Sequence, residues 1–160
     1  MRYALSAAAA GALYLGGSAR GLPPVVASHF GLGGQADAFM SRGAYLGVML
    51  VAIVVIPLGV ALLGRWAAAL PDAMVKLPNK AYWLAPERRA ATLAPLAARL
   101  EWLSVALTAF LSYVHWLVLR ANELPAPHLS AAAFAAGLAL FVAFALLWAV
   151  ALWRRFGRSA

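Results

Sequence analysis

The sequence predicts an all-α integral membrane protein with four transmembrane helices and both termini in the cytoplasm. The first observation is composition, because 65% of the 160 residues are hydrophobic and only 11% are charged. Soluble domains contain about 45–50% apolar and about 25% charged residues. The second observation is the presence of four charge-free apolar runs. The third is an uneven distribution of lysine and arginine among the segments that join them.

Four runs are expected to cross the bilayer. Three of them, residues 43–64, 102–119 and 130–153, approach or exceed the roughly 20 residues that a hydrocarbon core about 30 Å thick requires. The first run, residues 3–19, is shorter and rich in alanine, and its Gly-Ser-Ala end resembles a signal cleavage site. Because its charge-free stretch exceeds the core of a typical signal peptide, about 7–15 residues, we expect a retained helix. Pro57 lacks a backbone donor and should kink the second span.

The basic residues orient these spans. Lysine and arginine in short loops are retained in the cytoplasm during insertion. All but three of the 13 basic residues fall at the N-terminus, in the loop 65–100 or in the tail, which places these segments inside. The three exceptions, Arg20, Arg42 and Arg120, would lie outside, so the loop 20–42 and the loop after residue 119 face the exterior. The tail contributes Arg154, Arg155 and Arg158. No linker divides the chain, and we expect one domain, 1–160.

Several classes of function are not indicated. The net charge of +8 and the pI near 10.9 would fit a nucleic-acid-binding protein. However, the basic residues alternate with apolar segments and no nucleic-acid-binding motif is present, so we expect no nucleic-acid partner. Without cysteine there is no disulfide and no thiolate metal site. The sequence also lacks a phosphate-binding glycine loop and a serine nucleophile elbow. We therefore expect neither an enzyme nor a cofactor.

The exterior loop 20–42 carries the most informative pattern. Pro23 and Pro24 end the first helix, and the glycines at 31, 33 and 34 permit a tight reversal. Ser41 is placed to cap the second helix. We predict a compact, hairpin-like lid, with four apolar side chains packed on the helix ends. These are Val25, Val26, Phe30 and Phe39.

The spacing of Pro23, His29-Phe30, Gly34, Asp37, Phe39, Ser41 and Arg42 resembles the signature of a known membrane domain. This uncharacterised domain occurs at the N-terminus of SdpI-type toxin-immunity proteins and in small stand-alone bacterial membrane proteins. The chain departs from that pattern at Ala27 and Ala36, where proline is common, and at Gly31, often asparagine. SdpI-type proteins are longer and have additional spans. The resemblance implies a multi-pass protein of the bacterial inner membrane that acts in immunity or signalling. It also implies a binding surface for a protein or ligand, formed by His29, Phe30, Gly34, Asp37, Phe39 and Arg42.

The cytoplasmic loop contains a second segment, residues 77–89, that is similar to part of the stand-alone members. Tyr82 and Trp83 lie there among basic residues, a mixture suited to anionic lipid headgroups. The segment is either a membrane-surface element or a docking surface for a partner. Pro86 and Glu87 indicate a helix start, while Pro95 argues against one unbroken helix. The candidate interface residues are Asn79, Lys80, Tyr82, Trp83, Glu87, Arg88 and Arg89.

Few side chains have the chemistry of a reactive site. His29, Asp37 and His128 are candidate metal ligands, with Glu123 as a further exterior carboxylate, but their spacing matches no compact metal motif. The alternative is structural, with His29 bonded to a loop carbonyl and Asp37 capping the turn.

His115 is an ionisable residue inside a predicted span and is therefore a functional candidate. No second intramembrane histidine exists for haem, and the alternative is a hydrogen bond between helices, with Ser112 or Tyr113 nearby.

These observations favour a non-catalytic membrane protein that binds a protein or ligand at its exterior loop. One alternative is a small accessory subunit of a larger membrane complex, or a homo-oligomer. A second alternative is a metal-dependent membrane enzyme that uses His29, Asp37 and His128.

Overall fold

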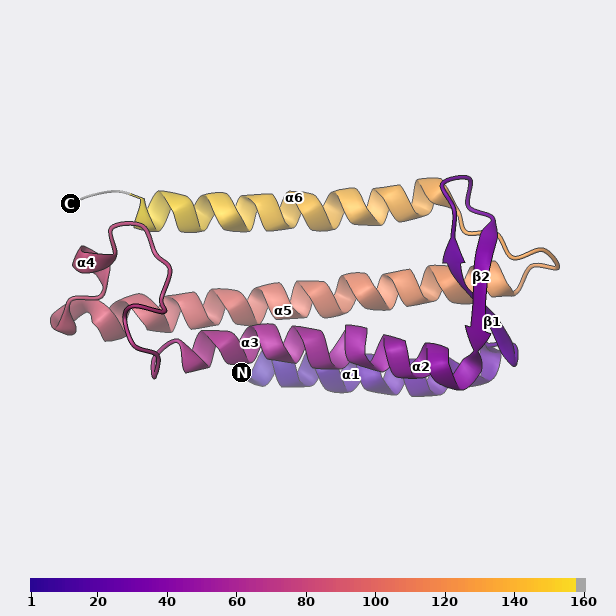
Figure 1. The fold of residues 1–160 in the computed structure, drawn as a ribbon, viewed down its shortest axis with the longest axis horizontal. Coiled ribbons are helices and arrows are strands. Elements are labelled where there is room, and N and C mark those ends of the chain that lie inside the picture. The colour runs from indigo at the N-terminus through magenta and orange to yellow at the C-terminus, as the bar shows by residue number, and fades with distance from the viewer. Residues whose placement is uncertain (158–160) are drawn as a thin grey trace.

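The computed structural model describes residues 1–157, so Arg158 of the predicted basic tail lies outside the described residues. The molecule is an elongated bundle of helices with a small β-hairpin at one end (Figure 1). The elements are α1 (Arg2–Ser18), η1 (Ala19–Gly21), β1 (Val25–Phe30), β2 (Ala36–Ser41), α2 (Arg42–Leu50), η2 (Val51–Val55), α3 (Ile56–Trp66), α4 (Lys80–Trp83), α5 (Pro86–Asn122) and α6 (Ala131–Phe156). We call the end with the strands the hairpin end, and the end with α4 the basic end.

Three helices are long and apolar enough to cross a membrane: Arg42–Trp66, Pro86–Asn122 and Ala131–Phe156. These correspond to the second, third and fourth predicted spans. The first two extend beyond the predicted bounds at both ends, and the last begins one residue later and ends three residues later than predicted. The helical membrane class is therefore confirmed, with the addition of a two-stranded sheet. The remaining predicted span corresponds to α1, whose 17 residues make a helix about 25 Å long. Its role as a fourth span stays a prediction.

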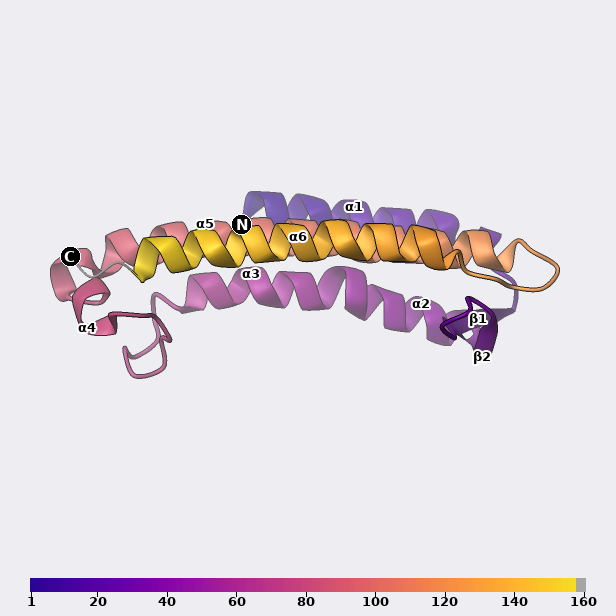
Figure 2. The same cartoon turned by 90° about the horizontal axis from the view of Figure 1, so that it is seen from above.

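Helix α5 is the centre of the bundle. Helix α1 and the continuous helix α2–η2–α3 pack against it, and α6 lies along it on another side (Figures 1 and 2). The main core is formed where α1, α2, η2 and α5 meet, around Leu15, Ile53 and Leu117. By contrast, no residue in the most apolar stretch of α6 is buried within the chain. A helix that is apolar on every side and unburied is suited to contact with lipid.

The second span contains a defect at Pro57 that takes the form of a widened turn. Pro57 has no N–H to donate to the carbonyl of Ile53, four residues earlier. The helix adopts a π conformation over Val51–Val55, immediately before the proline. The hydroxyl of Thr108 on α5 donates to the carbonyl of Ile53 at 3.2 Å. The backbone group that proline releases thus finds a partner inside the protein, as membrane helices require.

Polar residues of α5 join it to α1 and α2. His115 is fully buried, with Nε2 2.8 Å from the Ser18 hydroxyl and Nδ1 2.8 Å from the Tyr45 hydroxyl. Because Ser18 donates its proton to the carbonyl of Leu15, it accepts from Nε2–H, and Nδ1 accepts from Tyr45. The neutral imidazole is therefore fully satisfied. The partners are Ser18 and Tyr45, not the Ser112 or Tyr113 suggested by sequence proximity.

The other end of α1 is held by Glu101. Its carboxylate accepts a hydrogen bond from the backbone N–H of Ala4 at 3.2 Å and forms an ion pair with the amino group of Met1. A carboxylate at a helix N-terminus is stabilised by the unsatisfied N–H groups there. Glu101 therefore fixes the depth of α1 against α5.

The helix start expected at Pro86 is confirmed, but the prediction that Pro95 interrupts this helix is wrong, because α5 continues through it from Pro86 to Asn122. Proline inside a helix costs about 3 kcal/mol. Tertiary contacts offset this cost. A Cβ on Gly64 of α3 would lie 2.9 Å from the Cα of Ala97, so the two helices are in close contact here. A second hydrophobic cluster, Ala67, Val75, Leu84 and Leu93, covers the same part of α5.

We predict that Tyr45→Phe lowers the free energy of unfolding by about 0.5–2 kcal/mol, because it leaves a buried nitrogen of His115 without a donor. Tyr14→Phe is the matched control, since Tyr14 contacts the same imidazole through its ring edge. It should change stability by less than about 0.5 kcal/mol. Denaturation of the purified protein in detergent measures both. Equal effects of the two variants would contradict the proposed role of the Tyr45 hydroxyl.

Candidate functional site

The predicted lid is a β-hairpin. Strands β1 and β2 pair antiparallel, with Ala27 opposite Phe39, and irregularities in register occur on either side of His29. The reversal is closed by Gly31, whose N–H donates to the carbonyl of Gln35 at 3.0 Å. Bulges bend a strand and redirect its side chains. The hairpin lies across the end of the bundle, close to the start of α6 (Figure 1).

Asn122, the last residue of α5, fixes the middle of β1. Its side-chain oxygen accepts from the N–H of Ala27 at 2.8 Å, and its side-chain nitrogen donates to the carbonyl of Ala27 at 3.0 Å. The same nitrogen donates to the carbonyl of Val118 within α5. The amide of Asn122 therefore replaces a neighbouring strand at this position of β1.

The tip of the hairpin is held by the loop between α5 and α6. The N–H of Leu129 donates to the carbonyl of Gly34 at 2.8 Å, and the N–H of Ala36 donates to Pro127 at 3.3 Å. Gly34 has φ +82°, and a Cβ on it would lie 2.3 Å from the carbonyl oxygen of Leu129. Glycine is required there both by conformation and by space. Gly34, a predicted binding residue, thus has an anchoring function.

The base of the hairpin is closed by Arg42. Its N–H donates to the carbonyl of Pro24 at 3.0 Å, and its Nε donates to Pro23 at 3.4 Å. The hydroxyl of Ser41 accepts from the N–H of Ala44 and caps α2, as predicted. The hairpin is consequently fixed at its middle, tip and base.

His29 and Asp37 form an exposed pair on this fixed hairpin. His29 Nδ1 lies 2.5 Å from Asp37 Oδ1, and the side chains are 71% and 52% exposed. The predicted structural roles were a bond from His29 to a loop carbonyl and a turn cap by Asp37. The structure shows a different contact for these side chains. They bond to each other instead, across the two strands.

The apolar residues of the hairpin divide into two groups. Val26 is fully buried and Phe30 is half-buried, as predicted. Val25 and Phe39 are exposed, so the prediction that they pack on the helix ends is wrong. Leu32, at the tip, is fully exposed.

A pocket of about 360 Å³ lies beside the hairpin. Its walls come from residues 28–32 of the hairpin, from Val114 and Val118 of α5, and from Leu129, Ala131 and Phe134 at the start of α6. His29 and Ser28 supply polar atoms at its edge, and the other walls are mostly apolar. Ligand sites combine an apolar lining with few polar groups in this way.

The candidate metal ligands are not assembled. Within residues 1–157, no group of three His, Asp or Glu side chains is placed to hold a metal ion. His128 lies against Gly34, and Glu123 pairs with Arg120 at 2.9 Å. His29 and Asp37 therefore have no third ligand from His128.

At the basic end, part of the second motif binds the end of α6. The indole N–H of Trp83 donates to the carbonyl of Phe156 at 3.0 Å, and Asn79, with φ 49°, donates to the same carbonyl at 3.4 Å. The rings of Trp83 and Phe156 also meet edge to face. This part of the motif satisfies carbonyls that the end of a helix leaves free.

The charged residues of this motif make local contacts. Arg89 binds the carboxylate of Asp72 at 3.0 Å and the carbonyls of Ala68 and Leu70 at 2.6 Å each. Arg88 lies 4.0 Å above the ring of Tyr82 and 3.6 Å from Glu87. Lys80 is half-buried, whereas Tyr82 and Glu87 are exposed at this end.

Three polar residues of α5 that join it to other segments were not among the predicted site residues. Asn122, Thr108 and Glu101 all bond to other segments, and none of them was a candidate. They occur at seven-residue intervals with His115. A repeat of seven places side chains on nearly the same face of a helix. Polar residues at this spacing in an apolar segment were therefore a usable signal of buried contacts.

Comparison of the chain with family models, with curated proteins and with solved structures found no match.

We predict that Asn122→Ala loosens the hairpin without unfolding the bundle. Loss of two hydrogen bonds to Ala27, each contributing about 0.5–1.5 kcal/mol, should raise amide exchange in residues 25–30 by about tenfold or more. Hydrogen exchange with mass spectrometry measures this effect in detergent. Glu123→Ala changes the adjacent, exposed residue and should leave the exchange of β1 unchanged. If Asn122→Ala also leaves it unchanged, Asn122 is not the anchor of β1.

Proposed function

We propose that this chain is a four-span protein of the bacterial inner membrane that binds a protein or ligand through its exterior hairpin. The observation that carries the proposal is the exposure of His29 and Asp37 on a hairpin fixed at three places. An exposed ion pair contributes little to stability, about 0–1 kcal/mol. A site that is already ordered loses less conformational entropy on binding. The arrangement is thus better suited to recognition than to holding the fold together.

The pocket beside His29 indicates the kind of group that would bind. Phe30, Val118 and Phe134 present apolar surface, while His29 and Asp37 offer a donor and an acceptor next to it. A protein loop with an apolar side chain next to a polar group would match this surface. The resemblance of the hairpin motif to the SdpI-type domain supports immunity or signalling as the setting.

The distribution of charge supports an orientation with the hairpin outside. Of the described basic residues, only Arg20, Arg42 and Arg120 belong to the hairpin end. The loop 65–100 and the end of α6 hold most of the others, and short loops rich in lysine and arginine stay in the cytoplasm. In this orientation the N-terminal helix α1 also crosses the membrane, which brings the number of spans to four.

The binding proposal is tested with a photo-cross-linking amino acid at Leu32, the exposed tip residue, in membranes of the native host. We expect a discrete adduct that falls at least about tenfold in a His29→Ala, Asp37→Ala variant, equivalent to about 1.4 kcal/mol of binding free energy. The same probe at Leu124, an exposed residue of the other exterior loop, is the control and should give little of that adduct. An undiminished adduct in the folded double variant would remove His29 and Asp37 from the proposed site.

The orientation is tested with single cysteines, because the chain contains none. In spheroplasts, a membrane-impermeant maleimide should label Leu32→Cys at once. It should label Arg2→Cys and Met74→Cys only after the membrane is permeabilised. Labelling of Arg2→Cys together with Leu32→Cys would show that α1 does not span. The reverse pattern for Leu32→Cys and Met74→Cys would overturn the orientation.

A further inference from the structure

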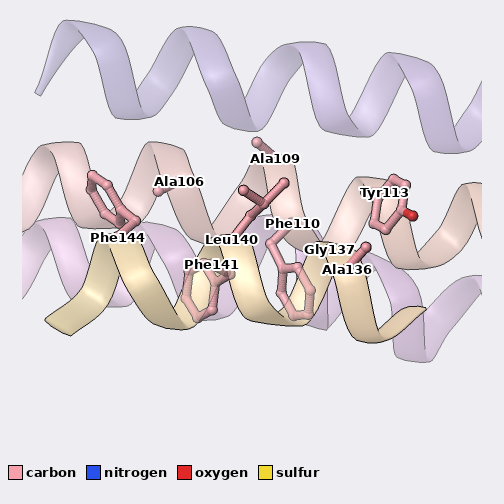
Figure 3. Close-up of a pocket in the computed structure, with 9 residues that line it drawn as sticks. All are labelled: Ala106, Ala109, Phe110, Tyr113, Ala136, Gly137, Leu140, Phe141 and Phe144. Carbon is pink, nitrogen blue, oxygen red and sulfur yellow. The ribbon is translucent and has the colours of Figure 1, made fainter. Parts of the chain in front are cut away.

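Helices α5 and α6 are joined by two hydrogen bonds from aromatic side chains to backbone carbonyls. The hydroxyl of Tyr113 donates to Ala133 at 2.7 Å, and the indole N–H of Trp148 donates to Arg99 at 3.0 Å. Between these two contacts lies a groove of about 390 Å³ (Figure 3). It is lined by Ala106, Ala109, Phe110, Tyr113, Ala136, Gly137, Leu140, Phe141 and Phe144.

The groove exists because small residues of both helices line it. At its hairpin-side end the helices are in close contact, since a Cβ on Gly137 would lie 2.3 Å from the ring of Tyr113. Further along, toward Ala106, the small side chain leaves space that the stacked rings of Phe110 and Phe141 only partly fill. The volume lies in the range of ligand sites, about 300–1,000 Å³. In a bilayer, such a groove on a membrane-spanning helix pair would be surrounded by lipid acyl chains.

Two arginines lie beyond one end of this groove. Arg99 and Ala106 are seven residues apart and share a face of α5 with Tyr113, and Arg155 shares a face of α6 with Trp148 in the same way. Arg99 is about 10 Å along the helix from Ala106, toward the basic end. Among the described residues, neither arginine forms an ion pair, and Nη1 of Arg99 is buried without a hydrogen-bond partner.

The depth of Arg99 matches a layer of phosphate groups. Trp148 lies one to two turns from the groove and at the level of Arg99. On the other side of α5, the ring of Trp102 stacks on Tyr3 near the start of α1. Aromatic rings of this kind gather at the boundary between hydrocarbon and headgroups. Arg99 therefore lies at this boundary, Arg155 lies about 10 Å beyond it along α6, and the groove lies within the hydrocarbon.

We propose that the α5–α6 groove binds one acyl chain of an anionic diacyl phospholipid, with its phosphate at Arg99. The apolar groove selects the chain, and the charge of Arg99 selects the negative headgroup. The site is separate from the hairpin and does not depend on which side of the membrane the hairpin faces. An arginine near a membrane surface contributes about 1 kcal/mol, so Arg99 should favour the anionic lipid about fivefold.

The charge requirement is tested by titrating the purified full-length chain with phosphatidylglycerol or phosphatidylcholine carrying identical acyl chains, and counting bound lipids by native mass spectrometry. We expect one phosphatidylglycerol per chain, bound more tightly than phosphatidylcholine. Arg99→Gln should weaken phosphatidylglycerol about fivefold and leave phosphatidylcholine unchanged. Arg154→Gln removes a neighbouring exposed charge and should have little effect. Equal affinity for both lipids, or equal effects of the two variants, would overturn the proposal.

The groove requirement is tested by filling it. Ala136→Leu should weaken both lipids by about tenfold or more, while Ala135→Leu, on the adjacent residue outside the groove, should weaken neither. Ala106→Leu fills the opposite end of the groove from α5 and should reproduce the loss, which separates blocking of the groove from damage to α6. If folded Ala136→Leu and Ala106→Leu bind phosphatidylglycerol as the unmodified chain does, the acyl chain does not occupy this groove.

Discussion

The structure depends on a row of polar side chains on one face of α5. Glu101, Thr108, His115 and Asn122 follow one another at seven-residue intervals and bond in turn to α1, η2, α1 with α2, and β1. Lipid offers no partners to such groups, so each is stable only when the segment that satisfies it is in place. His115 is the most constrained, because it is fully buried and both nitrogens require partners on different helices. The positions of α1 and α2 are thus specified by bonds as well as by packing.

The same periodicity explains why α6 packs on a different side of α5 from α1 and α2. Residues two positions apart on a helix point in nearly opposite directions, and the row Arg99, Ala106 and Tyr113 is offset by two from the polar row. Helix α5 therefore bonds to α1, α2 and β1 on one side and to α6 on the other. On the α6 side, the middle of the contact has small and aromatic residues in place of polar ones. That contact is correspondingly open, and it is where the groove forms.

Features that depend on local composition, such as spans and turns, could be predicted from the sequence. Features that depend on contacts between distant segments could not. Apolar runs of sufficient length predicted three spans, and Gly34 with its neighbouring glycines and prolines predicted the reversal. The partners of His115 were wrong, because a polar residue in an apolar run reveals its own depth but not which helix will face it. The break at Pro95 was wrong for a related reason, since contacts with α3 and with the cluster around Leu93 outweigh the local penalty. The anchor at Asn122 was missed although its spacing from His115 was visible.

The hairpin motif contains two kinds of residue: those that anchor the hairpin to the helices, and those whose side chains are exposed on it. Gly34, Ser41 and Arg42 are engaged with the loop after α5, with α2 and with the start of the hairpin. Within residues 1–157, the side chains of His29 and Asp37 bond only to each other, and both are exposed. A substitution at an anchoring residue changes the position of the His29–Asp37 pair. A substitution at the pair itself changes only the donors and acceptors exposed on the hairpin. The spacing of such a motif therefore specifies mainly the position of the hairpin, and it leaves the side chains of His29 and Asp37 exposed on the surface of that hairpin.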